Sequence, residues 1–158
     1  MDIKALFDEN EKPLEHLVSD GGFTKIFRTI GCIGDSLSSG EFESCDKDGK
    51  KGYHDMYEYS WGQFIARTCG STVYNFSRGG LTGEYFMGGA PQWGWYDYAK
   101  RAQAYIFALG VNDLYGKKFP VGTSDDHVED KTFAGWYMEI IRRYKEIQPQ
   151  AKFFLMTM

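Results

Sequence analysis

The sequence IFRTIGCIGDSL, residues 26–37, leads from an apolar segment into a turn that carries a serine. The apolar part is typical of the first strand of an α/β domain, and we predict a strand over residues 24–33. Ser36 then follows the carboxyl end of that strand, where open α/β sheets bind and transform ligands. A serine hydroxyl is inert alone, because it needs a base to take its proton and donors to hold a developing oxyanion. The sequence should therefore supply both.

Strands and helices alternate along the rest of the chain. The clearest helix follows Thr132, a suitable capping residue, and Gly70 is a natural end for an earlier helix. The predicted strands are 24–33, 71–76, 104–109 and 152–158, the predicted helices are 59–69, 95–103 and 132–148, and the predicted loops are 41–55, 77–94 and 110–130. Because alternation of this kind favours right-handed crossovers, we predict an α/β fold with a central parallel sheet.

The length of 158 residues indicates one domain. We expect an N-terminal arm over residues 1–23, which ends in a glycine-rich turn, and a domain over residues 24–158. The chain stops within the apolar segment FFLMTM, residues 153–158, with no turn or polar tail after it. Since native proteins avoid a bare apolar strand at a terminus, we expect a domain that is truncated after its fourth strand.

Composition excludes several classes of partner. The net charge is −4 and no basic stripe is present, so we expect no nucleic acid. No apolar run reaches about 18 residues and the N-terminus lacks an apolar signal segment, so we expect no membrane and a cytoplasmic location. The three cysteines, Cys32, Cys45 and Cys69, are predicted to be free thiols. No spacing suits a metal or a phosphate-binding loop, so we expect no cofactor; the oligomeric state stays open.

Two further loops carry polar groups to the predicted edge of the sheet. NFSRGGLT, residues 75–82, follows the second strand, and GVND, residues 110–113, follows the third. Successive parallel strands bring their carboxyl ends together, so these loops should meet Ser36. A glycine N–H can approach a ligand closely, and Asn112 offers two side-chain N–H donors. Together with the Ser36 N–H, these groups could form a three-donor oxyanion hole.

These three blocks, in this order and spacing, resemble the SGNH (GDSL-type) hydrolase family over about residues 24–158. The resemblance implies a flavodoxin-like three-layer α/β/α fold. It also implies that Ser36 is the nucleophile and that Gly80 and Asn112 donate to the oxyanion. The family's fourth block, Asp-x-x-His, supplies the base, and no such pattern occurs in this sequence. We therefore expect the histidine base beyond residue 158 and an inactive fragment without it.

Other polar residues have competing interpretations. Asp35 and Asp113 are expected to brace the loops that they stand in. Arg78 could bind a carboxylate or phosphate of a substrate, although an arginine at such a place is more often a surface or bracing residue. His54 and His127 could contact substrate, but a solvated surface histidine is the simpler interpretation of each. Aromatic clusters at residues 53–61 and 93–98 could pack the core or form platforms for sugar rings.

The resemblance thus implies a serine esterase that cleaves small acyl esters, including acetyl esters, and the aromatic clusters suggest a carbohydrate as the carrier of these esters. The alternative is a catalytically silent module of the same fold that binds a glycan or an acyl group. A flavin or nucleotide binder of similar topology is disfavoured, because no phosphate-cradling loop is present.

Overall fold

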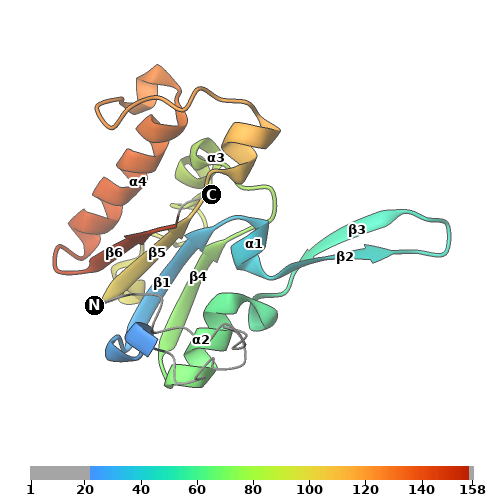
Figure 1. The fold of residues 1–158 in the computed structure, drawn as a ribbon, viewed down its shortest axis with the longest axis horizontal. Helices are drawn as coiled ribbons and strands as arrows, with labels where there is room; N and C mark the ends of the chain where they lie inside the picture. Colours follow the sequence, from blue (N-terminus) through green and yellow to red (C-terminus); the bar gives the residue numbers. More distant parts are fainter. Residues whose placement is uncertain (1–21, 157–158) are drawn as a thin grey trace, which may run out of the picture.

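The computed structural model describes residues 22–156, which form a parallel sheet with helices on both faces. The sheet has the strand order β4-β1-β5-β6 (Figure 1). Its strands are β1 (Thr29–Gly34), β4 (Thr72–Ser77), β5 (Ala104–Ala108) and β6 (Lys152–Leu155). All three pairings are parallel, so the predicted α/β fold and its parallel sheet are confirmed. Most of the predicted N-terminal arm lies outside the described residues.

Helices cover the two faces of the sheet. Helix α2 (Trp61–Cys69) packs on one face, and α3 (Gly83–Gly89) and α4 (Phe133–Ile147) pack on the other (Figure 1). Alternate side chains of β1 point to opposite faces, as the pleat of a strand requires. Ile33 joins the apolar cluster under α3 and α4, whereas Ile30 and Cys32 join the cluster under α2. The predicted three layers are therefore present.

The helix ends follow the polar residues at their boundaries. The Thr132 hydroxyl caps α4 by accepting a hydrogen bond from the Gly135 N–H at 3.1 Å. Ser60 caps α2 in the same way through the Gln63 N–H, and Gly70 ends that helix with a left-handed φ of 67°. The predicted cap at Thr132 and the predicted stop at Gly70 are confirmed.

Several segments differ from the prediction. The first strand begins only at Thr29, because Gly22–Ile26 forms a 3-10 helix. The polar segment predicted as a loop over 41–55 is a hairpin of β2 (Glu41–Cys45) and β3 (Lys51–Asp55), which projects from the body (Figure 1). Its antiparallel ladder satisfies the backbone without burying either face.

The remaining differences concern short helices. The segment 77–94 contains α3, which Thr82 caps by accepting from the Tyr85 N–H. The predicted helix over 95–103 was wrong, since only the 3-10 turn Tyr98–Lys100 forms there. The predicted loop 110–130 contains a π-helical turn at Asn112–Gly116 and a 3-10 turn at Val128–Asp130. Within residues 22–156, no helix is both long and apolar enough to cross a membrane.

Candidate active site

Ser36 is the first residue of α1 (Ser36–Ser39), and a single residue separates this helix from the end of β1. Asp35 occupies the intervening position and caps the helix: its Oδ1 accepts a hydrogen bond from the Leu37 N–H at 3.0 Å. The backbone carbonyl of Asp35 accepts further hydrogen bonds from the N–H groups of Ser38 and Ser39. Ser36 itself is half-buried, while both later serines of the helix are buried. The turn thus holds Ser36 at the carboxyl edge of the sheet, where a ligand can reach it.

The order of the strands brings the three predicted loops to one edge. β1 lies between β4 and β5, and Gly34 at its end pairs with Ser77 on one side and with Ala108 on the other. The three strands therefore end at the same level. The loops that carry Ser36, Gly80 and Asn112 leave the sheet beside one another.

The loop after β4 is a tight turn that exposes a backbone donor. The Leu81 N–H donates to the Arg78 carbonyl at 3.4 Å, which closes a four-residue turn over Arg78–Leu81. Gly80, the third residue, has a φ of 71°, as a type II turn requires. Gly80 is exposed, and the space beside its Cα is open. Among the described residues its N–H donates no hydrogen bond, so this donor is available to a ligand atom.

Asparagine side chains tie the loops together. Asn112 donates from Nδ2 to the Leu81 carbonyl at 3.1 Å, which joins the third loop to the Gly80 turn. Asn75 donates from Nδ2 to the Ser38 carbonyl at 3.1 Å, which joins β4 to α1. An asparagine amide has two N–H groups, so Asn112 has a second donor to offer to a ligand.

Two buried aspartates lie behind these loops. Asp113 Oδ1 accepts a hydrogen bond from the Gly83 N–H at 2.9 Å, and Asp35 caps α1 as described above. The second carboxylate oxygen of each is buried with no hydrogen-bond partner among the described residues. Burial raises the pKa of both carboxyl groups, and the charge of Asp35 raises the pKa of Asp113 further. Both side chains hold backbone segments in place rather than face an open site.

A groove of about 830 Å³ runs from the Gly80 turn along α3. Two aromatic side chains line it, and each lies under a cation. The Arg78 guanidinium lies 4.8 Å from the ring centroid of Trp93, and the Lys117 ammonium lies 5.5 Å from that of Tyr85. The groove lining comprises Arg78, Gly79, Gly80, Leu81, Glu84, Tyr85, Gly88, Gly89 and Trp93. Ser36 and Asn112 lie outside this lining, so the groove meets the predicted site only at the glycine turn.

Neither described histidine makes a hydrogen bond to Ser36. His54 is an exposed residue of β3, where its Nε2 lies 2.9 Å from the Ser44 Oγ and its ring stacks on Phe42. His127 is exposed in the loop before α4, and its backbone N–H donates to Asp130 Oδ2 at 2.8 Å. The described part of the chain therefore brings together a serine and donors, without a histidine base. It also holds no group of His, Cys, Asp and Glu side chains suited to a metal ion.

Sequence reasoning missed the base of the β2–β3 hairpin. Asp55 and Glu41 are cross-strand partners there, and both contact the turn after β4. Asp55 Oδ1 accepts a hydrogen bond from the Gly79 N–H at 3.0 Å. The turn signal DKDG at residues 46–49, between two segments of similar length, could have indicated the hairpin. No local signal indicates the contact with Gly79.

Comparisons with known proteins agree with this arrangement of strands and loops. A family model described as GDSL-like lipase/acylhydrolase matches residues 30–158. No curated protein matches the sequence.

Several solved structures share the fold at low sequence identity. A protein from Chitinophaga pinensis DSM 2588, described as a possible lipase, is 24% identical with a TM-score of 0.54, over 80% of this chain and 47% of that one. An active-site mutant of a family two carbohydrate esterase from Clostridium thermocellum is 19% identical with a TM-score of 0.59, over 81% and 42%. A carbohydrate esterase described as having divergent catalytic and non-catalytic binding functions is 15% identical with a TM-score of 0.55, over 81% and 48%. This chain spans about half the length of these proteins.

Proposed function

This chain belongs to the GDSL-like lipase/acylhydrolase family, and from that premise we propose that it is a serine esterase with Ser36 as its nucleophile. The observation that carries the proposal is the meeting of three loops at one edge of the sheet. The loops that follow β1, β4 and β5 there carry a half-buried serine, an exposed glycine and an asparagine amide.

In the proposed reaction, the Ser36 Oγ attacks the carbonyl carbon of an ester. The carbonyl oxygen becomes an oxyanion, which the N–H groups of Ser36, Gly80 and Asn112 hold by hydrogen bonds. The carbon–oxygen bond to the alcohol breaks, and the alcohol leaves with a proton. Water then attacks the acyl-serine and releases the carboxylic acid. The general base that moves these protons lies outside residues 22–156 in this proposal, since neither His54 nor His127 is joined to Ser36.

We propose small acyl esters on carbohydrates, including acetyl esters, as substrates. Two observations support this choice. The groove beside Gly80 presents Tyr85 and Trp93, and aromatic side chains offer large apolar surfaces to a sugar ring. Carbohydrate esterases are also among the proteins that share the fold. Arg78 stands at the same groove and would contact a substrate there, whereas His54 and His127 are not part of its lining.

Hydrolysis of acetylated oligosaccharides and of 4-nitrophenyl acetate by the full-length protein tests the proposal. We expect release of acetate, and Ser36→Ala should lower kcat by about 10⁴-fold or more, because the nucleophile is lost. Ser44→Ala in the exposed hairpin is the matched control and should leave kcat unchanged. Equal hydrolysis by wild type and Ser36→Ala would contradict the proposal.

A glycan-binding module without turnover is the second candidate. It is favoured by the lack of a histidine joined to Ser36 in residues 22–156. Calorimetric titration with a deacetylated oligosaccharide distinguishes the two candidates. A module of this kind binds the oligosaccharide and releases no acetate from its acetylated form.

A further inference from the structure

One carboxylate oxygen of the β2–β3 hairpin joins the helix of Ser36 to the turn of Gly80. Asp55, the last residue of β3, accepts a hydrogen bond at Oδ1 from the Gly79 N–H at 3.0 Å. The same oxygen accepts a hydrogen bond from the Ser39 hydroxyl at 2.5 Å. Ser39 ends α1, whose first residue is Ser36, and Gly79 precedes Gly80 in the turn. The hairpin base thus lies between the two parts of the proposed site.

The hydrogen bond to Gly79 fixes the direction in which the turn points. Gly79 is the second residue of the turn over Arg78–Leu81, so its N–H takes no part in the bond that closes the turn. Without an acceptor for that N–H, the turn could rotate about its two ends. The bond to Asp55 holds the peptide between Arg78 and Gly79. The next peptide of the turn carries the Gly80 N–H, and its position depends on the one that is held.

Glu41 restricts the same glycine from a second direction. A Cβ atom at Gly79 would lie 1.7 Å from Glu41 Oε2 and 3.5 Å from Asp55 Oδ1. The hairpin base therefore packs against the backbone of the turn, and only a glycine fits there without movement of Glu41. Partial burial raises the pKa of Glu41, and the charges of Asp55 and Asp35 raise it further. The contact between hairpin and turn is thus steric as well as hydrogen-bonded.

We propose that Asp55 is a positioning residue, which sets the Gly80 N–H at its working distance from Ser36. The inference rests on the proposed function, and it makes the hairpin base a part of the catalytic apparatus. A displacement of about 1 Å can cost on the order of 10²-fold in rate, so loss of the carboxylate should slow the chemical step.

Three variants of the full chain test the proposal. Asp55→Ala should lower kcat by about 10- to 100-fold with little change in KM. Asp55→Asn keeps an oxygen that can accept from Gly79 and should retain most of kcat. Asp46→Ala is the matched control, because one oxygen of Asp46 likewise accepts two hydrogen bonds, here from the backbone N–H groups of Asp48 and Lys50, but does so at the hairpin tip. Its kcat should equal that of the wild type.

Amide hydrogen exchange provides a readout that does not need activity. Exchange at Gly79 should be faster in Asp55→Ala than in the wild type, and unchanged in Asp55→Asn. A wild-type kcat in Asp55→Ala, or an equal loss in Asp46→Ala, would overturn the proposal. If the wild type hydrolyses no ester, the proposed function is wrong, whatever the exchange data show. If exchange at Gly79 is unchanged in Asp55→Ala, the positioning role is wrong, whatever the activity.

Discussion

Asn112 shows how single polar atoms connect the parts of the site. Its Nδ2 donates to the Leu81 carbonyl, so it holds the turn that exposes the Gly80 N–H. The same amide has a second N–H for a ligand. In the proposed reaction, Asn112 donates one hydrogen bond to the oxyanion. It also holds the turn whose Gly80 N–H donates another.

We therefore expect Asn112→Ala and Asn112→Asp to lower kcat by about 10²–10³-fold, with a smaller change in KM. The Asn112→Asp variant loses both side-chain N–H groups and gains a negative charge. Its kcat should therefore fall at least as far as that of Asn112→Ala. Steady-state kinetics with 4-nitrophenyl acetate measures the effect, and a thermal melt checks that each variant is folded. A kcat within about twofold of wild type in a folded Asn112→Ala protein would contradict the role of Asn112.

The buried carboxyl of Asp113 should make stability depend on pH. Burial raises its pKa above the ordinary value of 3.8, so the folded state binds the proton more tightly than the unfolded state. The free energy of unfolding should therefore fall as pH rises from about 3.8 through the folded-state pKa. Asp113→Asn cannot ionise and retains an oxygen that can accept from the Gly83 N–H.

Relative to the wild type, Asp113→Asn should gain stability as pH rises from about 4 to 7. Urea denaturation across this range measures the difference. Asp46→Asn is a suitable control, since Asp46 is exposed at the hairpin tip. If the difference in free energy of unfolding between Asp113→Asn and wild type does not vary with pH, the raised pKa of Asp113 is contradicted.

At the scale of residues, contiguous motifs could be predicted and distant contacts could not. GDSL at residues 34–37 and GVND at residues 110–113 each follow a strand, so their meeting at one edge follows from parallel topology. Asp55 binds a residue 24 positions away, and nothing near Asp55 in the sequence specifies that partner. The role of Asp55 therefore required the structure.

Among the elements, α4 depends most clearly on a local sequence signal. The Thr132 hydroxyl accepts from the Gly135 N–H and donates to Asp126 Oδ2 at 2.7 Å. These two hydrogen bonds restrict the conformations that are open to the loop before α4. Hydrogen bonds from the Thr123 and Thr132 hydroxyls lower the pKa of Asp126.

Thr132→Ala should lower the free energy of unfolding by about 1 kcal/mol, because a helix N–H loses its partner. Thr132→Ser keeps the hydroxyl and should stay close to wild type. Urea denaturation of both variants measures the difference. Equal stability of the Ala and Ser variants would show that the cap contributes nothing.

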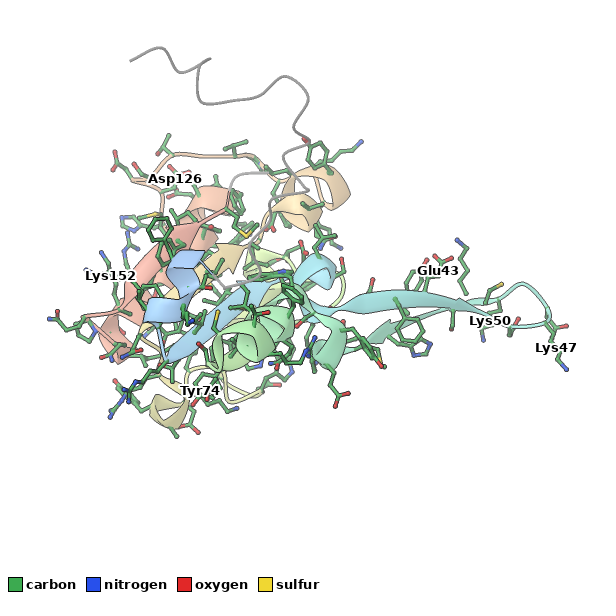
Figure 2. All side chains as sticks on the ribbon, turned by 60° about the horizontal axis from the view of Figure 1, so that its bottom comes forward. Glu43, Lys47, Lys50, Tyr74, Asp126 and Lys152 are labelled. Carbon is green, nitrogen blue, oxygen red and sulfur yellow. The ribbon has the colours of Figure 1, made fainter. Side chains whose placement is uncertain are left out.

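The elements that sequence reasoning missed lack a buried apolar face or a strong helix propensity. The β2–β3 hairpin is charged along its length, and Figure 2 shows Glu43, Lys47 and Lys50 along the projecting arm. A strand whose two faces are both exposed does not show the alternation of apolar and polar residues from which strands are predicted. Helix α3 is short and contains three glycines, which are poor helix formers. It forms because Thr82 caps it and Phe86 is buried in the core.

At the scale of the whole molecule, Tyr144 connects the helices to the sheet. Its ring lies 4.6 Å from Tyr105 of β5 and 5.7 Å from Phe76 of β4, measured between centroids. Its hydroxyl donates to the Trp95 carbonyl at 3.1 Å. Only 1% of Tyr144 is exposed, so removal of its ring would leave a cavity in the centre of the larger apolar cluster.

We expect Tyr144→Ala to lower the free energy of unfolding by about 3–5 kcal/mol. Tyr144→Phe keeps the ring and loses only the hydrogen bond to Trp95, so its cost should be about 1 kcal/mol. Chemical denaturation separates the two values. Similar losses in both variants would show that the hydroxyl, rather than the packed ring, holds this region together.

Ser36 as the nucleophile is tested most directly by reaction of the full-length protein with a fluorophosphonate, followed by peptide mass spectrometry. The proposed site predicts one adduct, on the peptide that contains Ser36. The adduct should be absent in Ser36→Ala and present in the Ser44→Ala control. A protein that hydrolyses esters yet carries no adduct on Ser36, or carries it on another serine, would contradict the assignment of this residue.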